Sequence, residues 1–272
     1  MTMEDNAYVL GHADVEIQRL LLQGRLYNDH TEHALRLAGL RPGMRVLDVG
    51  CGPGDVSFAA ARLVGPTGTV VGVDAAGDVV EFARARAAEL GLSTVTFEQT
   101  DIADIAMEPV DAVIGRLILV HLPDPISTVR QLAGLVRPGG LIAFSEFDIG
   151  ATRSIPESAL SRALVDGIMR TFQRVGLDPA FGTTLHTLFQ QAGLGVPQLT
   201  FSAPVGTAND TEAWAYSAAV WRLLYPIAEQ FGLVTDELAD IDTLLPRMLE
   251  QAAEGDAILV LPPMITAWTR VN

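Results

Sequence analysis

The stretch Val46-Leu-Asp-Val-Gly50-Cys-Gly52-Pro-Gly54 decides the fold, because a short apolar run leads directly into a turn with three glycines. The residues up to Val49 are typical of a buried strand. The glycines have no Cβ, so the chain can turn tightly and a ligand can come close to its backbone. A helix is predicted to begin next, and the amide groups of its first turn would face that ligand. By itself the turn fits a dinucleotide site or an ordinary tight loop equally well.

Short β-rich runs alternate with helical runs from residue 44 to residue 148. The strands are predicted at 44–49, 69–74, 95–99, 110–114 and 141–147, and the helices at 56–64, 79–90 and 125–136. Near-continuous apolar strands separated by helices predict a doubly wound, Rossmann-like α/β fold with a parallel sheet covered on both faces. Ligands of such sheets bind at the carboxyl ends of the strands, which is where we look for chemistry.

The chain outside this region is predicted to add mainly helices. They are expected at 12–38, 158–175, 183–192, 210–230 and 235–254, with further strands at 198–205 and 258–271. We divide the chain into an N-terminal helical lid (1–40), a core (41–150) and a remainder of the sheet with a helical substrate cap (151–272). Trp214, Trp221 and Tyr225 recur at helical spacing in that cap. They would either form its core or line an apolar substrate pocket.

Two carboxylates follow the next predicted strands. Asp74 ends the run Val70-Val-Gly-Val-Asp74, and Asp101 follows the strand that contains Phe97. An acid at the first position can accept hydrogen bonds from both hydroxyls of a ribose, and one at the second could bond the exocyclic amine of adenine. Each acid alone could simply cap a turn or a helix. Their shared place at carboxyl strand ends, next to the glycine turn, favours a site of nucleoside size.

Four motifs in order resemble those of class I S-adenosylmethionine (SAM)-dependent methyltransferases. They are Val46-Leu-Asp-Val-Gly-Cys-Gly-Pro-Gly54, Val70-Val-Gly-Val-Asp74, Asp111-Ala-Val-Ile-Gly-Arg116 with His121-Leu-Pro-Asp-Pro125, and Leu135-Val-Arg-Pro-Gly-Gly-Leu-Ile-Ala-Phe144. The resemblance covers residues 40–148 and is greatest to the small-molecule branch that includes ubiquinone- and menaquinone-type enzymes. It implies a seven-stranded sheet whose last strand is antiparallel. The Gly-x-Gly-x-Gly spacing also differs from the Gly-x-Gly-x-x-Gly of dinucleotide sites.

The resemblance implies roles for individual residues. The three glycines would cradle the methionine part of SAM, Asp74 the ribose, and Asp101 with Ile102 the adenine. Asp48 and the backbone of Arg116 would complete the shell. The N-terminal helix would close over it as a lid, or it is a surface helix packed on the edge of the sheet. The residues expected to line the cofactor site are Tyr8, Gln23, Asp48, Gly50, Cys51, Gly52, Gly54, Asp74, Ala75, Asp101, Ile102 and Arg116.

Methyl transfer needs few catalytic side chains, because the methyl carbon on the sulfonium is already an electrophile. The protein must align the nucleophile and exclude water, and a general base helps only when the nucleophile keeps its proton. His121 is the candidate base, or it packs against the helix that starts near Asp124. Arg116 would hold an acidic group of the substrate, or it pairs with a carboxylate of the protein.

Composition excludes several other classes of function. The net charge is −15 and all 18 basic residues are arginines. A strongly acidic chain with scattered arginines argues against a nucleic-acid partner. The absence of lysine excludes a Walker-A phosphate loop, a Schiff base and a Tyr-x-x-x-Lys oxidoreductase site.

The chain is expected to be a cytoplasmic enzyme. No apolar run reaches the length of a membrane span, the N-terminus is acidic, and the single cysteine, Cys51, cannot form an internal disulfide. We predict a SAM-dependent methyltransferase that acts on an O, C or N atom of a small, mainly apolar metabolite, without a metal. A SAM-bound scaffold or regulatory protein is the alternative, and a nicotinamide enzyme is a weaker one. The chain could also form a homodimer, which the sequence does not decide.

Overall fold

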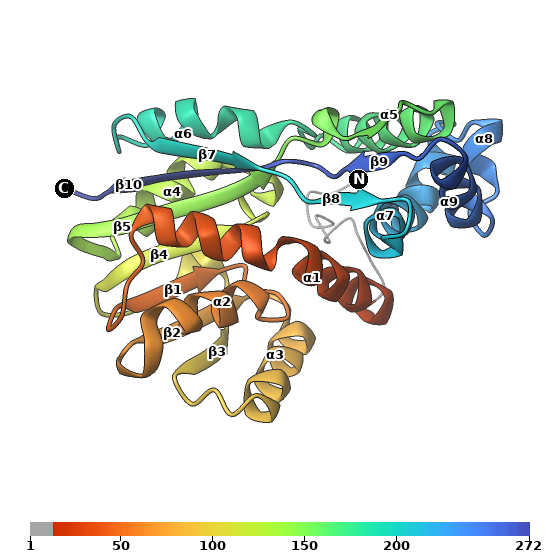
Figure 1. The fold of residues 1–272 in the computed structure, drawn as a ribbon. Helices are drawn as coiled ribbons and strands as arrows, with labels where there is room; N and C mark the ends of the chain where they lie inside the picture. Colours follow the sequence, from red (N-terminus) through yellow and green to blue (C-terminus); the bar gives the residue numbers. More distant parts are fainter. Residues whose placement is uncertain (1–12) are drawn as a thin grey trace. The chain divides into compact units, whose positions relative to one another are not determined.

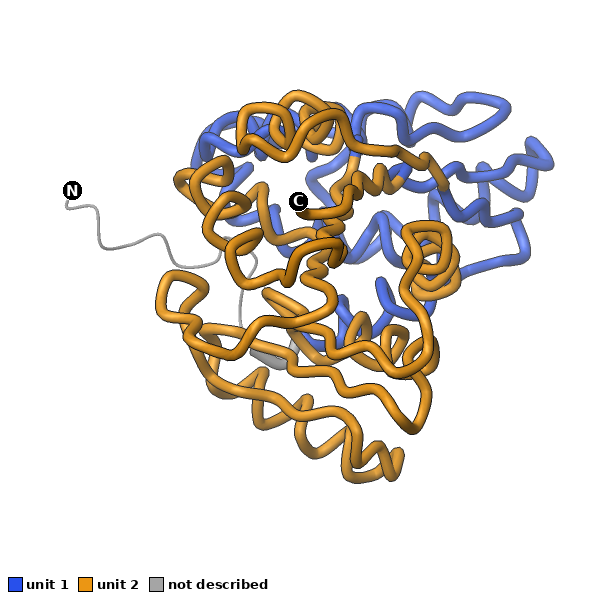
Figure 2. Tube along the Cα trace, turned by 90° about the vertical axis from the view of Figure 1, so that its left-hand side faces the viewer, with its two compact units in different colours: residues 1–26, 148–179, 203–263 blue, residues 27–147, 180–202, 264–272 orange. Residues whose placement is uncertain are grey.

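The computed structural model describes residues 13–272, which form two compact units (Figure 2). The core unit comprises residues 27–147, 180–202 and 264–272. The helical unit comprises the described residues before 27 together with 148–179 and 203–263. Helix α1 (Ala13–Ala38) contributes to both. The division into lid, core and cap remains a prediction.

A seven-stranded sheet lies at the centre of the core unit (Figure 1). Its strands, in spatial order, are β3 (Val95–Gln99), β2 (Thr69–Asp74), β1 (Arg45–Val49), β4 (Val110–Arg116), β5 (Val136–Phe147), β10 (Met264–Arg270) and β7 (Gln198–Ser202). Strand β10 is antiparallel to both of its neighbours, and the other pairings are parallel. The predicted α/β fold with an antiparallel last strand is therefore confirmed.

Both faces of this sheet are covered by helices, as its apolar strands predict. Successive residues such as Val46 and Leu47 enter opposite hydrophobic clusters, because side chains alternate along a strand. One cluster includes residues from the C-terminal end of α1, from α2 (Asp55–Val64) and from α3 (Gly77–Glu89). The other takes α4 (Pro125–Ala133) and α6 (Leu185–Gln191), on the opposite side of the sheet (Figure 1).

Proline residues break two of the predicted strands. The segment 198–205 separates into β7 and β8 (Val205–Thr207), with Pro204 between them. The segment 258–271 separates into β9 (Ile258–Val260) and β10 around Pro262 and Pro263. A proline has no N–H to donate to a ladder, so each strand ends there.

The predicted helix at 235–254 is likewise two helices. They are α8 (Asp236–Ala239) and α9 (Leu244–Glu254). The Asp240 side chain accepts hydrogen bonds from the amides of Asp242 and Thr243, each at 3.2 Å. This side-chain turn competes with the helical backbone pattern and separates the two helices.

The helical unit has its own small core. A three-stranded antiparallel sheet, β6 (Arg153–Ile155), β9 and β8, accompanies α5 (Ala159–Arg174), α7 (Thr211–Gln230), α8 and α9. Trp214 and Trp221 are buried, and their indole N–H groups donate to the carbonyls of Thr207 and Leu238. These two tryptophans are therefore core residues of this unit. Strand β6, only three residues long, was not predicted.

Short 3-10 helices connect these elements in residues 13–272. They are η1 (Gly65–Thr67), η2 (Ile102–Asp104), η3 (Leu119–His121), η4 (Ile149–Ala151) and η5 (Phe181–Thr184). Within the described part of the chain, no helix combines the length and the apolar character that a bilayer span requires.

Candidate cofactor site at the carboxyl ends of the strands

The glycine turn after β1 needs its glycines for different reasons. Gly50, Gly52 and Gly54 all have positive φ angles, +65°, +52° and +90°, which other residues rarely adopt. A Cβ on Gly50 would lie 2.7 Å from the Ile118 side chain, and one on Gly54 would lie 2.8 Å from Phe97. A Cβ on Gly52 would meet nothing within 4 Å in the part of the chain that the structure describes. The backbone at Gly52 is thus the part of the turn that a ligand can approach.

Asp74, at the end of β2, is joined directly to this turn. Its Oδ2 accepts a hydrogen bond from the Gly52 amide at 2.9 Å, and its Oδ1 accepts one from the Ala76 amide at 3.0 Å. The Cys51 amide also donates to the Val73 carbonyl at 3.0 Å. Each carboxylate oxygen has a second lone pair, so Asp74 can still accept hydrogen bonds from a ligand.

Asp101 lies at the next strand end. The Thr100 amide donates to the Asp74 carbonyl at 3.0 Å, which keeps the ends of β3 and β2 level. The exposed Asp101 carboxylate caps η2 by accepting from the Ala103 amide at 2.8 Å. The half-buried Ile102 follows it. The structure therefore brings the glycine turn, Asp74 and Asp101 together along one edge of the sheet, in the order that the sequence predicts.

Asp48 contains a buried carboxylate that lacks a partner on one side. Its Oδ2 accepts a hydrogen bond from the Ser57 hydroxyl at 2.6 Å. Its Oδ1 is buried and has no hydrogen-bond partner among the residues that the structure describes. Burial raises the pKa of Asp48 to about 7, against the opposing effects of Ser57 and the positive charge of Arg116. A buried acceptor of this kind calls for a donor or a cation.

Arg116, at the end of β4, is held by the second half of α1. Its guanidinium donates to the Asn28 side-chain oxygen at 3.2 Å and to the Thr31 hydroxyl at 2.8 Å. Asn28 in turn donates to Asp55, the first residue of α2, at 3.3 Å. Neither Asn28 nor Thr31 was predicted. Burial of Thr31 on a helix is visible only once the packing partner is known.

An arginine of α3 supports the outside of the glycine turn. Arg86 donates to the backbone carbonyl of Pro53 and pairs with the Asp55 carboxylate at 2.9 Å. Its guanidinium also lies 5.1 Å from the centre of the Phe58 ring. Arg86 is 33 residues from Pro53 in the sequence, so no local pattern could have indicated this role.

A second buried carboxyl group lies at the end of β5. Glu146 is only 1% exposed, and its Oε1 accepts hydrogen bonds from the amides of Ile118 and Leu119 at 3.0 and 2.7 Å. Burial raises its pKa to about 8, although these amides favour the ionised form. The amides belong to the segment that leads from β4 into η3, which ends at His121. Glu146 lies in a predicted strand, but its role was not predicted.

The other predicted residues have the following places. His121 is half-buried at the end of η3, and Ala75 is exposed after β2. Cys51 is buried, and burial raises the pKa of its thiol well above the usual range, so it is not a reactive thiolate. Gln23 belongs to the helical unit, where its Oε1 accepts from Arg19 at 2.8 Å and from the Tyr216 hydroxyl at 3.0 Å. Tyr8 lies outside the described residues.

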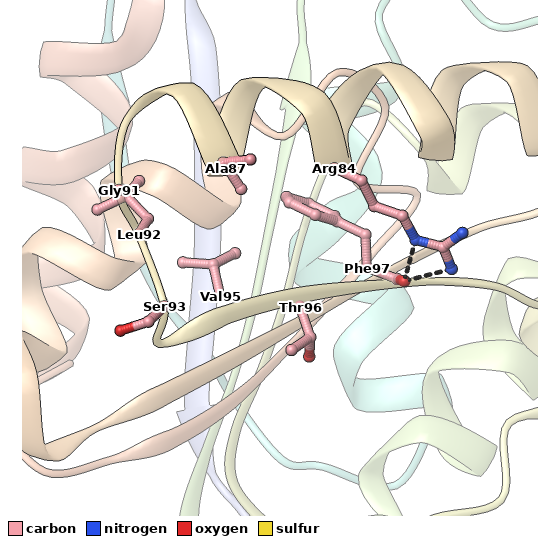
Figure 3. Close-up of a pocket in the computed structure, with 9 residues that line it drawn as sticks. Arg84, Ala87, Gly91, Leu92, Ser93, Val95, Thr96 and Phe97 are labelled. Carbon is pink, nitrogen blue, oxygen red and sulfur yellow. Dashed lines mark hydrogen bonds between the residues drawn. The ribbon is translucent and has the colours of Figure 1, made fainter.

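A depression of about 530 Å³ also marks the core unit, between the end of α3 and the start of β3 (Figure 3). Arg84 borders it and donates from Nε and one terminal nitrogen to the Phe97 carbonyl at 2.9 and 2.7 Å. Its remaining lining is Ala87, Ala88, Gly91, Leu92, Ser93, Val95, Thr96 and Phe97. Because Val95 begins β3, this depression lies away from the carboxyl strand ends. It contains none of the predicted site residues.

Comparison with known families decides what kind of domain this is. A family model described as a methyltransferase domain matches residues 40–192, more than half of the chain. The chain belongs to this methyltransferase family. The match contains the glycine turn, Asp74, Asp101, Arg116 and Glu146.

Curated relatives of this methyltransferase domain are similar over part of their length. Nocamycin O-methyltransferase from Saccharothrix syringae is 41% identical over 128 residues, which cover 46% of this chain and 43% of the relative. Ubiquinone biosynthesis O-methyltransferase from Paracidovorax citrulli is 38% identical over 130 residues, 45% of this chain and 53% of the relative. The aligned region thus spans about half the length of these relatives.

Solved structures share the fold at low sequence identity. The YcgJ protein from Bacillus subtilis has a TM-score of 0.57 and 18% identity, covering 89% of this chain and 98% of that protein. The [4+2]-cyclase SpnF has a TM-score of 0.54 and 20% identity, covering 89% of this chain and 80% of the cyclase. The fold of this methyltransferase domain therefore occurs in proteins with differently named activities, and the site must carry the functional argument.

Proposed function

We propose that this chain binds SAM and transfers its methyl group to an O, C or N atom of a small, mainly apolar metabolite. The observation that carries the proposal is the buried, half-satisfied carboxylate of Asp48 at the strand that leads into the open backbone of Gly52. Membership in the methyltransferase family supports the same conclusion.

The residues present fit this cofactor. The Asp48 carboxylate would accept a hydrogen bond from the ammonium group of the methionine part. That ammonium group would be the cation that the buried Oδ1 atom calls for. Gly52 would let that part approach the backbone, because none of the described residues fills the space where its Cβ would be. Asp74 would accept from the ribose hydroxyls, and Asp101 from the adenine amine, with Ile102 against the ring.

Bound SAM would supply an electrophilic methyl group, and the protein's own residues would orient the acceptor and exclude water. His121 is proposed as the base for an acceptor that keeps its proton. Arg116 is proposed to favour an acidic group on the acceptor, while Asn28 and Thr31 fix its guanidinium. No metal is part of the proposal.

Calorimetry with S-adenosylhomocysteine (SAH) tests the binding half of the proposal. We expect the wild-type chain to bind SAH and the Asp74→Ala variant to bind it roughly 10- to 100-fold more weakly, because hydrogen bonds to a charged acceptor are lost. Asp78→Ala, an exposed acid in the first turn of α3, is the matched control and should bind normally. The proposal fails if the wild type does not bind SAH, or if Asp74→Ala binds it equally well.

Transfer of a labelled methyl group tests the catalytic half. The chain is incubated with methyl-labelled SAM and an extract of small metabolites. Labelled product is expected with wild type and should fall in the His121→Ala and Arg116→Ala variants. Tight SAM binding with no labelled product in any extract would favour the alternative, a scaffold or regulatory protein.

The remaining parts of the proposal rest on composition. The net charge of −15 supports a small-molecule acceptor over a nucleic acid. A single buried cysteine supports a cytoplasmic location, where thiols stay reduced. A homodimer is kept open, and light scattering coupled to size-exclusion chromatography would decide it.

A further inference from the structure

The segment between β4 and η3 has a strained conformation that something must hold. Leu117 has a φ angle of +57°, which is uncommon for a residue other than glycine. Residues in such conformations persist only where neighbouring contacts fix them. Here the Leu117 amide donates to the Ser145 carbonyl at 2.8 Å. The next two amides both donate to Oε1 of Glu146.

Glu146 is buried, and the backbone beside it is closely packed. It is 1% exposed, and a Cβ on Gly182 would lie 2.7 Å from the Glu146 carbonyl oxygen. Segment η5, which contains Gly182, is therefore packed closely against this end of β5. The buried carboxyl group accepts both amide hydrogen bonds through one oxygen, which sets the positions of the two amides relative to β5.

The amide of Ile118 is one of these two, and its side chain contacts the glycine turn. The distances from a Cβ on Gly50 would be 2.7 Å to both Cγ1 and Cδ1 of Ile118. A Cβ on Gly115 would lie 3.1 Å from Cγ2 of the same side chain. Ile118 thus fits against two backbone positions that have no side chain, one at the end of β1 and one in β4. Ile118 is therefore the side chain that limits the turn at Gly50, in addition to the hydrogen bonds that Asp74 and Arg86 make to Gly52 and Pro53.

We propose that Glu146 is a positioning residue that holds the Ile118 and Leu119 amides, so that Ile118 is pressed against Gly50 and fixes the glycine turn for SAM. The proposal rests on the proposed SAM binding at that turn. Glu146 touches neither the turn nor the reacting atoms in this account. Its influence passes through the side chain of Ile118.

Hydrogen exchange and SAH calorimetry on full-length variants test this role together. In Glu146→Ala, exchange of the Ile118 and Leu119 amides should rise, and SAH affinity should fall about tenfold, because the two buried hydrogen bonds that position Ile118 are lost. Glu146→Gln keeps an oxygen acceptor and should restore near wild-type affinity. Adding Glu146→Ala to Ile118→Ala should weaken SAH binding little further, because both changes act through one contact.

Two more variants separate this role from a general loss of stability. Thr266→Val removes the buried 2.8 Å hydrogen bond to Ser145 on the neighbouring strand, so it should lower stability and leave SAH affinity unchanged. Ile118→Val removes only the Cδ1 atom next to Gly50, and it keeps the test valid if Glu146→Ala does not fold. Wild-type SAH affinity in Ile118→Val, or faster exchange in Glu146→Ala without weaker binding, would overturn the proposal. Failure of the wild type to bind SAH would instead overturn the proposed function.

Discussion

At the scale of residues, the site depends on two buried carboxyl groups and a few glycines. Asp48 and Glu146 lie at the ends of the central strands β1 and β5, and burial raises the pKa of each, to about 7 and about 8. The sequence pointed to Asp74 and Asp101 through their places at strand ends, and the family resemblance added Asp48. The sequence did not identify Glu146, because its partners are backbone amides 27 and 28 residues away.

Asp48 should make SAH binding depend on pH. In the folded protein without a ligand, the pKa of Asp48 is about 7. Only the ionised carboxylate pairs well with an ammonium group. SAH affinity should therefore rise from about pH 6 to about pH 8, with binding near pH 7 releasing protons. Calorimetry in buffers of different ionisation enthalpy measures both effects. In Asp48→Asn the affinity should be lower and this pH dependence should be gone; a persisting rise would show that another group is responsible.

Gly52 should be needed for the ligand and not for protein packing. Gly52→Ala places a Cβ more than 4 Å from the atoms of the described residues other than its chain neighbours, so its expected cost to stability is the strain of a positive φ angle, about 1–2 kcal/mol. SAH binding should nevertheless be lost, because the Cβ occupies the approach to the backbone. Gly193→Ala, after α6, is the control, with a φ of +84° and open space around its Cβ among the described residues. Equal SAH affinity in the two variants would contradict the placement of the ligand.

At the scale of elements, helices and strands largely follow the predicted pattern, and the exceptions have local causes. The apolar strands 69–74 and 95–99 have the predicted bounds. The long strands predicted at 198–205 and 258–271 are each divided at prolines. Those prolines are visible in the sequence, so this error was avoidable. Contacts between elements, such as Arg86 with the glycine turn, depend on packing that no local pattern reveals.

Two arginines of α3 allow the support of the glycine turn to be measured. Arg86→Met removes the contact to the Pro53 carbonyl and leaves the buried Asp55 without its cation. We expect a loss of about 1–3 kcal/mol in the free energy of unfolding and weaker SAH binding. Arg84→Met removes a similar contact to the Phe97 carbonyl, beside the depression of Figure 3. It should lower stability without changing SAH affinity, and weaker binding in both variants would contradict a specific role for Arg86.

At the scale of the whole molecule, the order of motifs predicted the sheet correctly, since each motif is tied to one strand end. The second half of the chain was less predictable, because its segments alternate between the two units. Residues 180–202 and 264–272 belong to the core unit, and the segments around them belong to the helical unit. Only long-range contacts distinguish these assignments.

The buried carboxyl groups should also set the pH dependence of stability. Both folded-state pKa values lie above those of the unfolded chain, so the folded protein holds more protons. Their contribution to stability is complete below about pH 4 and is lost as pH rises through about 7 and 8. Urea unfolding between about pH 5.5 and 9 should therefore show falling stability. The Asp48→Asn/Glu146→Gln double variant should show a flatter profile, and an unchanged slope would assign the effect to other groups.

A crystal structure with SAH bound tests the central claim most directly. We expect the methionine part of SAH beside Gly52 and Asp48, its ribose hydroxyls on Asp74 and its adenine next to Asp101. In that structure Oδ1 of Asp48 would gain the partner that it lacks among the described residues. SAH bound elsewhere, for example in the depression between α3 and β3, or bound with Asp48 and Asp74 out of contact, would contradict it.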